Sequence, residues 1–422
     1  MYDSSVRFFK TSAMIKFLAG SLLLSTLSLG VRADDVIAGS DVRRINAFSL
    51  RQLKLLAADA DRNLVLSPPS VATVLAMMQV GARNNSHREL ESALGMSGEK
   101  TRSVYGGLAN YLGAYVDGPD KTLVIANKIF LQFGFTPFPS FSKDLKSYFS
   151  TEIDHINFRM TNSRKPICEW VSSHTQNKIR RIFVKDPPNN TEIVIASVFF
   201  YKSNWEHRFD KELTKLANFE VSPGKFVTVP TMHHGAIPAR HGSSDKLQAK
   251  WVMLPFESGR FCMLVILPNN RFGLAELIKE MTGSDMNQIL TGREYTNVEI
   301  SLPKFKLTST ILLNEELRHM GIPSAFREAN YFEHITKEPL EVGNLVHKAV
   351  FEVDETGGAG TASTGTRLGR EIRTNSDNSF NVDHPFLAAV VETRRYLPVL
   401  FAVVQDPSKS IAEESEGEDS SC

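Results

Sequence analysis

The sequence predicts an α+β fold with antiparallel sheets. Helical spacing of apolar residues is concentrated in the first half of the chain, and short apolar strands dominate the second half. The 422 residues are 42% hydrophobic and carry a net charge of +1. This is enough for one large or two ordinary globular domains, and the near-neutral charge gives no electrostatic reason to expect a nucleic acid as partner.

The first 33 residues have the pattern of a secretory signal peptide. Basic residues precede the apolar run Phe17–Gly30, and small residues lead from it to Ala33. The run is shorter than the ~20 apolar residues that a membrane span requires. We therefore expect a secreted, extracellular protein that is not held in a membrane, with residues 34–45 as a short N-terminal segment. Two sequons, at Asn84 and Asn189, predict glycosylation.

In the first half, apolar periodicity and helix-start signals such as Ser67 followed by two prolines indicate the helices. We expect these helices at Arg43–Ala58, Ser67–Gly81, Glu99–Tyr111, Lys143–Phe149 and Arg164–Ile182. Apolar runs rich in β-branched residues predict strands at Asn63–Leu66, Leu123–Phe133 and Glu192–Tyr201.

In the second half, strands outnumber helices. Strands are predicted at Trp251–Leu254, Phe261–Leu267, Val298–Leu302, Val346–Val353, His384–Val391 and Leu397–Val404. Helices are predicted at Leu274–Met281 and Leu312–Met320. The acidic residues 408–422 are expected to be a disordered tail.

Three cysteines are too few for a disulfide framework in a secreted chain of this length. Cys168 and Cys262 lie among apolar residues, so we expect both to be inert core thiols. Cys422, at the end of the chain, is predicted either to be free or to pair between molecules.

A long segment of small residues separates two of the late strands. Thr356–Thr366 contains only Gly, Ala, Ser and Thr, a composition typical of flexible linkers. Its threonines also suit a strand, and no proline would interrupt the hydrogen bonds of a sheet. From composition alone, the segment is either a linker or a loop that is exposed in one state and a strand in another.

Motifs of enzymes are absent from the sequence: we find no G-x-S-x-G, G-x-x-x-x-G-K-[ST] or H-E-x-x-H. We therefore predict no catalytic residue, no metal and no cofactor. His233, His234 and His241 lack further ligands at metal-binding spacing and are expected in a solvated turn. The helix Glu99–Tyr111 has only two basic residues, so a glycosaminoglycan site is not indicated.

Six stretches, taken together and in order, resemble the serpin family over Asn46–Pro407. They are NLVLSPPSVATVLAMMQVGA (Asn63–Ala82), EWVSSHTQNKI (Glu169–Ile179), VIASVFFYKSNW (Val194–Trp205), SLPKFKLTST (Ser301–Thr310), VHKAVFEVDETGG (Val346–Gly358) and DHPFLAAVV (Asp383–Val391). The resemblance implies one monomeric domain, residues 46–407. Such a domain has about eight or nine helices, three mostly antiparallel sheets and an exposed reactive-centre loop, here residues 355–384.

The resemblance also implies a mechanism. A serine protease attacks the loop and forms a covalent acyl-enzyme, and the loop then inserts as a strand into the large sheet and distorts the protease. The hinge that inserts first corresponds to Glu355, Thr356, Gly357, Gly358, Ala359, Gly360, Thr361, Ala362 and Ser363. Gly358 and Gly360 depart from inhibitory members, which more often have Thr or Ser and then Ala, and this favours slower insertion.

Two functions are compatible with this resemblance: inhibition of a trypsin-like serine protease, and a non-inhibitory role as carrier, storage protein or chaperone. Non-inhibitory members tend to have charged, bulky or proline residues in the part of the hinge that inserts, and Gly357–Ser363 has none. The sequence therefore favours an inhibitor.

The family's usual spacing from Glu355 reaches Glu371, and a spacing one residue shorter reaches Arg370. An arginine suits the acidic specificity pocket of trypsin-like proteases. We predict Arg370–Glu371 as the reactive bond and Glu371–Ile372 as the second choice. Further arginines in this segment are Arg367 and Arg373.

By resemblance, Ser67, Ser70 and His347 match the polar cluster beneath the large sheet, called the shutter, and Trp205 matches a tryptophan at the top of this sheet. Ser197 stands where the family usually has Asn, a change expected to lose one hydrogen bond of ~0.5–1.5 kcal/mol. His347 as a catalytic base is the rival hypothesis, but no nucleophile accompanies it in the sequence.

Overall fold

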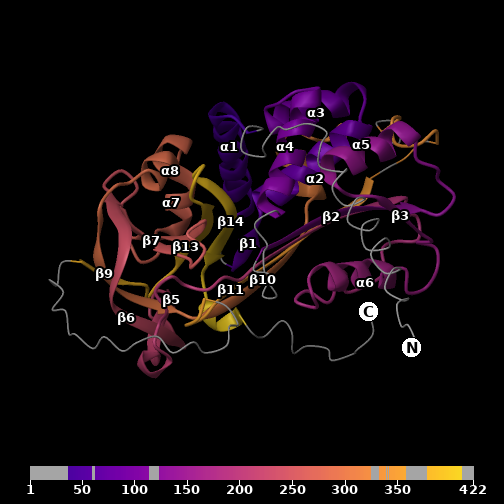
Figure 1. Ribbon diagram of the computed structural model, residues 1–422. Coiled ribbons are helices and arrows are strands. Elements are labelled where there is room, and N and C mark those ends of the chain that lie inside the picture. Colours follow the sequence, from indigo (N-terminus) through magenta and orange to yellow (C-terminus); the bar gives the residue numbers. More distant parts are fainter. Residues whose placement is uncertain are drawn as a thin grey trace, which may run out of the picture.

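The computed structural model describes residues 37–58, 62–113, 123–324, 332–338, 340, 342–357 and 378–410. These residues form two sheets and nine α-helices (Figure 1). The signal-peptide segment, the hinge from Gly358 onward, the predicted reactive bond and Cys422 all lie outside the described residues.

The helices are α1 (Gly39–Leu56), α2 (Pro68–Gly81), α3 (Asn84–Leu94), α4 (Gly98–Gly113), α5 (Pro139–Phe149), α6 (Lys165–His174), α7 (Leu274–Glu280), α8 (Gly283–Leu290) and α9 (Asn314–His319). The strands are β1 (Leu64–Leu66), β2 (Leu123–Gln132), β3 (Ile153–Ile156), β4 (Ile193–Tyr201), β5 (Lys215–Ser222), β6 (Lys225–Ser244), β7 (Ala249–Pro255), β8 (Phe261–Pro268), β9 (Tyr295–Pro303), β10 (Phe305–Leu312), β11 (Val342–Val353), β12 (Ser379–Asn381), β13 (Phe386–Glu392) and β14 (Leu397–Val404).

The five-stranded sheet has the strand order β10-β11-β4-β2-β3. Its two central neighbours, β11 and β4, run parallel, although β10 and β2 on their outer sides run antiparallel to them. All nine residues of β4 are buried, because apolar layers cover both faces of the sheet. Trp170 of α6 packs in a cluster on one face with Val198 and Val350.

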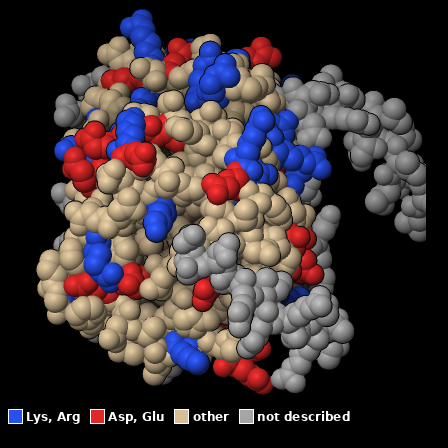
Figure 2. All heavy atoms as spheres, turned by 90° about the vertical axis from the view of Figure 1, so that its left-hand side faces the viewer, with Lys and Arg blue, Asp and Glu red and all other residues tan. Residues whose placement is uncertain are grey.

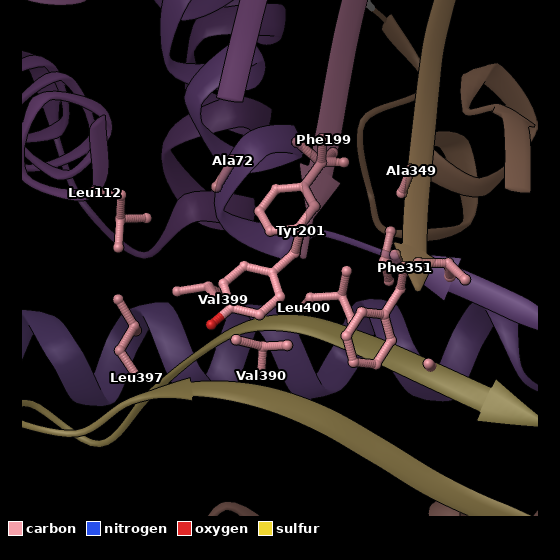
Figure 3. Packing of buried hydrophobic residues seen from close by; sticks show 14 of the residues in the cluster. Ala72, Leu112, Phe199, Tyr201, Ala349, Phe351, Val390, Leu397, Val399 and Leu400 are labelled. Carbon is pink, nitrogen blue, oxygen red and sulfur yellow. The ribbon is translucent and has the colours of Figure 1, made fainter. Parts of the chain in front are cut away.

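The opposite face of this sheet packs on the main core. Figure 3 shows Phe199 and Tyr201 of β4 and Phe351 of β11 directed toward Val399 and Leu400 of β14. The central strands therefore have no solvent-facing side, unlike a typical antiparallel sheet with one wet face.

The second sheet has nine strands, in the order β1-β14-β13-β8-β7-β6-β9-β12, and β5 pairs with β6. The 20-residue strand β6 pairs with β5 along its first part, with β9 along its middle and with β7 at its end. It therefore joins two of the three expected sheets into one hydrogen-bonded sheet. The expected α+β serpin fold is otherwise confirmed.

Helix α2 lies in the centre of the molecule. Every residue of α2 except Val80 is buried, which is the pattern of a helix that is apolar all round. Ser67 precedes it as N-cap, and Pro68 and Pro69 occupy its first turn, where no amide hydrogen is needed for the helix ladder. This start places Ser67 and Ser70 beneath the five-stranded sheet.

Two local predictions were wrong. The helix expected at Arg164–Ile182 ends at His174, because Gln176 and Asn177 adopt positive φ angles of 51° and 61°. The three histidines expected in a turn lie on β6 instead. The helix expected at Leu312–Met320 is present as α9, although Leu312 itself belongs to strand β10.

The cysteine prediction was half right. Cys262 is a buried free thiol, and burial raises its pKa to about 12. Cys168 is also buried, on α6, but it is disulfide-bonded, so the prediction of a free thiol there was wrong. An apolar setting in the sequence predicts the burial of a cysteine, and it does not exclude a bonded one.

The surface is mixed in charge. On the face shown in Figure 2, basic and acidic side chains lie in small groups among uncharged residues. Asn84 and Asn189 are both exposed, so their predicted glycosylation is compatible with the fold. Within the described ranges, no helix is long and apolar enough to cross a membrane.

Candidate functional site

A buried polar cluster links the two central strands of the five-stranded sheet. His347 of β11 lies opposite Ser197 of β4 in the strand register, and the His347 Nδ1 to Ser197 Oγ distance is 3.1 Å. The amide of Ser67 donates to His347 Nε2 at 3.0 Å. Because Nε2 accepts this bond, the proton of the neutral ring is on Nδ1, from which it is donated to Ser197.

The same cluster connects the sheet to helix α2 and to β14. The Ser67 hydroxyl donates to the carbonyl of Val399 at 2.9 Å and lies 2.9 Å from the Ser70 hydroxyl. Ser67, Ser70, Ser197 and His347 are all fully buried. The structure thus brings together the four predicted shutter residues, although their role in sheet opening stays a prediction.

Burial controls the protonation of His347. Desolvation by burial disfavours the charged ring and lowers the pKa of His347 from 6.5 to about 3. A neutral, hydrogen-bonded ring in a packed interior has no access to a substrate. This geometry disfavours the hypothesis of a catalytic base.

The short side chain of Ser197 has a measurable consequence one strand away. Asn127 of β2 lies opposite Ser197 in the antiparallel register, so both side chains are on one face of the sheet. Asn127 Oδ1 is buried and has no hydrogen-bond partner among the residues that the structure describes. Ser197 therefore keeps its hydrogen bond to His347, and the group without a partner is the side-chain oxygen of Asn127. Asn127 was not identified from the sequence.

Trp205 closes the end of the sheet where β4 and β11 finish. Its indole Nε1 donates to the carbonyl of Asp354 at 2.8 Å. Its ring stacks on Phe256, with centroids 4.7 Å apart and an interplanar angle of 12°. The tryptophan is therefore fixed both to the segment that follows β11 and to the nine-stranded sheet, as expected for a residue at the top of the five-stranded sheet.

The first residues of the hinge are held at this end by an ion pair. Glu355 is only 5% exposed and lies 2.8 Å from Lys304 Nζ, and it accepts a 2.9 Å hydrogen bond from Thr214. Burial acts to raise the pKa of Glu355, but the bonds from Lys304 and Thr214 outweigh it and lower the pKa. Lys304 and Thr214 were missed because sequence spacing gives no signal for a contact over 51 or 141 residues.

The backbone of the hinge already pairs with the segment that follows β4. Ser203 N donates to Gly357 O, Trp205 N to Thr356 O and Phe209 N to Glu355 O, each at 3.0 Å. Gly357 has φ +77°, and a Cβ atom there would lie 2.3 Å from the carbonyl oxygen of Ser203. Both the backbone angle and the close approach therefore require glycine.

The histidines of β6 form no metal site. His233 contacts Ser301, with Nδ1 and Oγ 2.9 Å apart, and His241 contacts Thr296, with Nε2 and Oγ1 2.7 Å apart. Nowhere in the described ranges do three or more His, Cys, Asp or Glu side chains gather in a way that could hold a metal ion.

The pKa of His347 generates a prediction on pH. Between pH 6.5 and about pH 3, the unfolded chain binds a proton that the native ring does not, so stability falls as the pH falls. The contribution is roughly 1.4 kcal/mol per pH unit. His347→Gln can keep both hydrogen bonds, and we expect a shallower loss of stability between pH 6 and pH 4 in urea unfolding. The exposed His319→Gln is the control, and equal slopes for His347→Gln and wild type would contradict this account.

The unpartnered Asn127 oxygen generates a second prediction. Ser197→Asn supplies an amide that can donate to Asn127 Oδ1, so we expect the free energy of unfolding to rise by about 0.5–1.5 kcal/mol. Ser197→Ala should lower it, because the buried His347 Nδ1–H then has no acceptor. Urea unfolding of both variants at neutral pH measures the changes. A loss of stability in Ser197→Asn would show that packing, not hydrogen bonding, limits this position.

Gly357 generates a third prediction. Gly357→Ala should lower the free energy of unfolding by more than the ~1–2 kcal/mol that a left-handed backbone costs an L-residue, since the new Cβ also meets the Ser203 carbonyl. Gly224→Ala is the matched control, because φ is +71° there and no atom lies within 4 Å. Equal losses in the two variants would mean that the close approach at Gly357 carries no cost.

Comparison with known proteins agrees with this geometry. The family model described as serpin (serine protease inhibitor) matches residues 43–407. The chain is 31% identical over 357 residues to Iripin-8 of the tick Ixodes ricinus, covering 82% of this chain and 88% of that protein. The crystal structure of Manduca sexta serpin-12 is 26% identical, with a TM-score of 0.77, and the match covers 86% of this chain and 98% of the other.

The thermophilic serpin Tengpin, in its native state, has a TM-score of 0.80 at 24% identity, with coverage of 88% and 95%, and supports the fold. The family is described as one of serine protease inhibitors, which are not themselves enzymes, and this confirms the prediction that the protein is not an enzyme. The chain belongs to the serpin family of serine protease inhibitors.

Proposed function

We propose that this serpin is a secreted, irreversible inhibitor of a trypsin-like serine protease, acting by acyl-enzyme trapping and loop insertion. The proposal rests on the parallel pairing of β11 and β4, which the chain leaves at the turn Glu355–Gly357. A chain that turns back at Gly357 and passes between these strands runs antiparallel to both. Insertion then replaces one parallel ladder by two antiparallel ladders, which are slightly more stable per residue.

The length of strand β4 matches the length of the uncharged part of the loop. Strand β4 has nine residues, and the uncharged run Gly358–Thr366 also has nine. At ~3.3 Å per residue, both span about 30 Å. The first charged residue, Arg367, would therefore reach the far end of β4 instead of entering the sheet.

The burial of both faces explains the composition of the loop. A strand between β11 and β4 would face Trp170 of α6 on one side and the His347–Ser197 cluster on the other. A charged side chain there would be buried without a partner, at a cost of several kcal/mol. The small uncharged residues of the loop avoid this cost, and the same composition disfavours the non-inhibitory alternative.

The specificity rests on Arg370. An arginine before the cleaved bond pairs with the buried acidic group of a trypsin-like specificity pocket. The uncharged hinge followed by this arginine supports Arg370–Glu371 as the reactive bond, with Glu371–Ile372 second and Arg373 a further candidate. The apolar leader supports secretion.

The decisive experiment separates recognition from trapping. Wild-type protein incubated with trypsin should give a denaturation-resistant complex at the summed mass and release a C-terminal fragment that starts at Glu371. Arg370→Ala should lose the complex. Thr361→Glu should still be cleaved after Arg370 but give no complex, because the charge prevents insertion.

The wild type and both variants are analysed by denaturing gel electrophoresis and by mass spectrometry of the released fragment. Trypsin that lacks its active-site serine is the control, since it can form no ester. Cleavage of the wild type without a complex and without a rise in melting temperature would contradict the inhibitor function and favour a carrier or storage role. An unchanged complex with Arg370→Ala would move the reactive bond.

A further inference from the structure

A cavity of about 250 Å³ lies among four helices on the side of the molecule remote from the hinge. It is bordered by the end of α2, by α3, α4 and α5, and by His334 of the segment that leads to β11. The four helices lie together at the upper right of Figure 1. Neither the shutter cluster nor the hinge contributes to the cavity.

Two buried hydrogen-bond donors face this cavity without a partner. Gln79 lines the cavity and is 3% exposed, and its Nε2 is buried with no hydrogen bond in the described part of the chain. Arg102 also lines the cavity, and its Nε is likewise buried and unpaired, while its Nη1 bonds to Asp144 at 3.1 Å. A buried donor without an acceptor destabilises the native state, so the pair indicates a missing acceptor.

Helix ends give the cavity its polarity. The first turns of α3, α4 and α5 border it through His87, Gly98 and Ser140, and these helices have 11, 16 and 11 residues. Helix N-termini carry partial positive charge and favour anions. In the first turn of α4, Glu91 accepts the amide hydrogen of Gly98, and the Ser97 carbonyl accepts those of Lys100 and Thr101, so this helix end contributes only its partial positive charge.

The end of α2 does not cancel this polarity. The carbonyls of Gln79 and Gly81 accept the amides of Ala82 and His334. The nearest formal charges are paired, Arg102 with Asp144 and Arg83 with Glu333. An oxygen acceptor with negative charge therefore fits the unpaired donors best.

The lining also includes the apolar residues Val80 and Phe141, together with Ser140 and the Asp144 carboxylate that is paired with Arg102. We propose that this cavity binds a small organic carboxylate, with Gln79 and Arg102 as its hydrogen-bond donors and Phe141 against its apolar part. Such a ligand contacts α2, α4, α5 and the segment before β11 at once. Its binding stabilises the native arrangement of these elements by mass action.

Benzoate is the probe, because it has one carboxylate and an apolar ring that the cavity can hold. Saturation-transfer NMR and melting curves of the whole protein over a benzoate series should show saturable binding and a rising melting temperature. Gln79→Leu removes one donor and should weaken the affinity at least tenfold. Arg102→Lys, which keeps the charge beside Asp144 but removes Nε, should weaken it in the same direction.

Gln52→Leu is the matched control. Gln52 is 1% exposed, both of its amide atoms are buried without a partner, and it lies on α1, away from the cavity. This variant should bind benzoate as the wild type does. The proposal is overturned if the wild type shows no saturable binding, which means that the cavity holds water only, or if Gln52→Leu loses as much affinity as Gln79→Leu. Tighter binding of inorganic sulfate than of benzoate would contradict the proposal that the ligand is an organic carboxylate.

Discussion

The parallel contact between β11 and β4 is the constraint on which the rest of this structure depends. Parallel neighbours must be joined by a long connection, and the chain between β4 and β11 includes most of the nine-stranded sheet. The two strands are held together by their ladder, by the His347–Ser197 bond across it and by apolar layers on both faces. Each of these contacts must be interrupted for another strand to enter, so together they set the barrier to opening.

Hydrogen bonds and an ion pair offset the cost of burying the polar groups of this contact. His347 is neutral and satisfied on both nitrogens, so it contributes hydrogen bonds without the cost of a buried charge. At the end of the strands, Glu355 is charged and buried, and the ion pair with Lys304 and the hydrogen bond from Thr214 offset the cost of burying its charge. The neutral hydrogen bond in the middle of the β11–β4 contact and the ion pair at its end respond differently to pH and salt, so the middle and the end of this contact are controlled separately.

The sequence predicted the strands and helices that have one strong pattern. Ile193–Tyr201 and Leu397–Val404 are continuous apolar runs, and α2 has both a start signal and an apolar surface, so their positions were right within a residue or so. Strands β5 and β6 were missed because half of their residues face solvent and polar residues interrupt the pattern. The family resemblance located His347 and Ser197, but neither resemblance nor periodicity pointed to Asn127, whose role comes from its register in the sheet.

One feature of the nine-stranded sheet affects how the molecule is made. Strand β1, near the start of the body, has β14 as its one partner among the described strands, and Leu64 lies opposite Val403. Ser67, directly after β1, likewise donates to the carbonyl of Val399. A ribosome delivers the N-terminal part first, so neither contact can form until nearly the whole chain has been synthesised. Helix α2 and the shutter therefore acquire their final anchor last, and β1 remains an unpaired edge throughout translation.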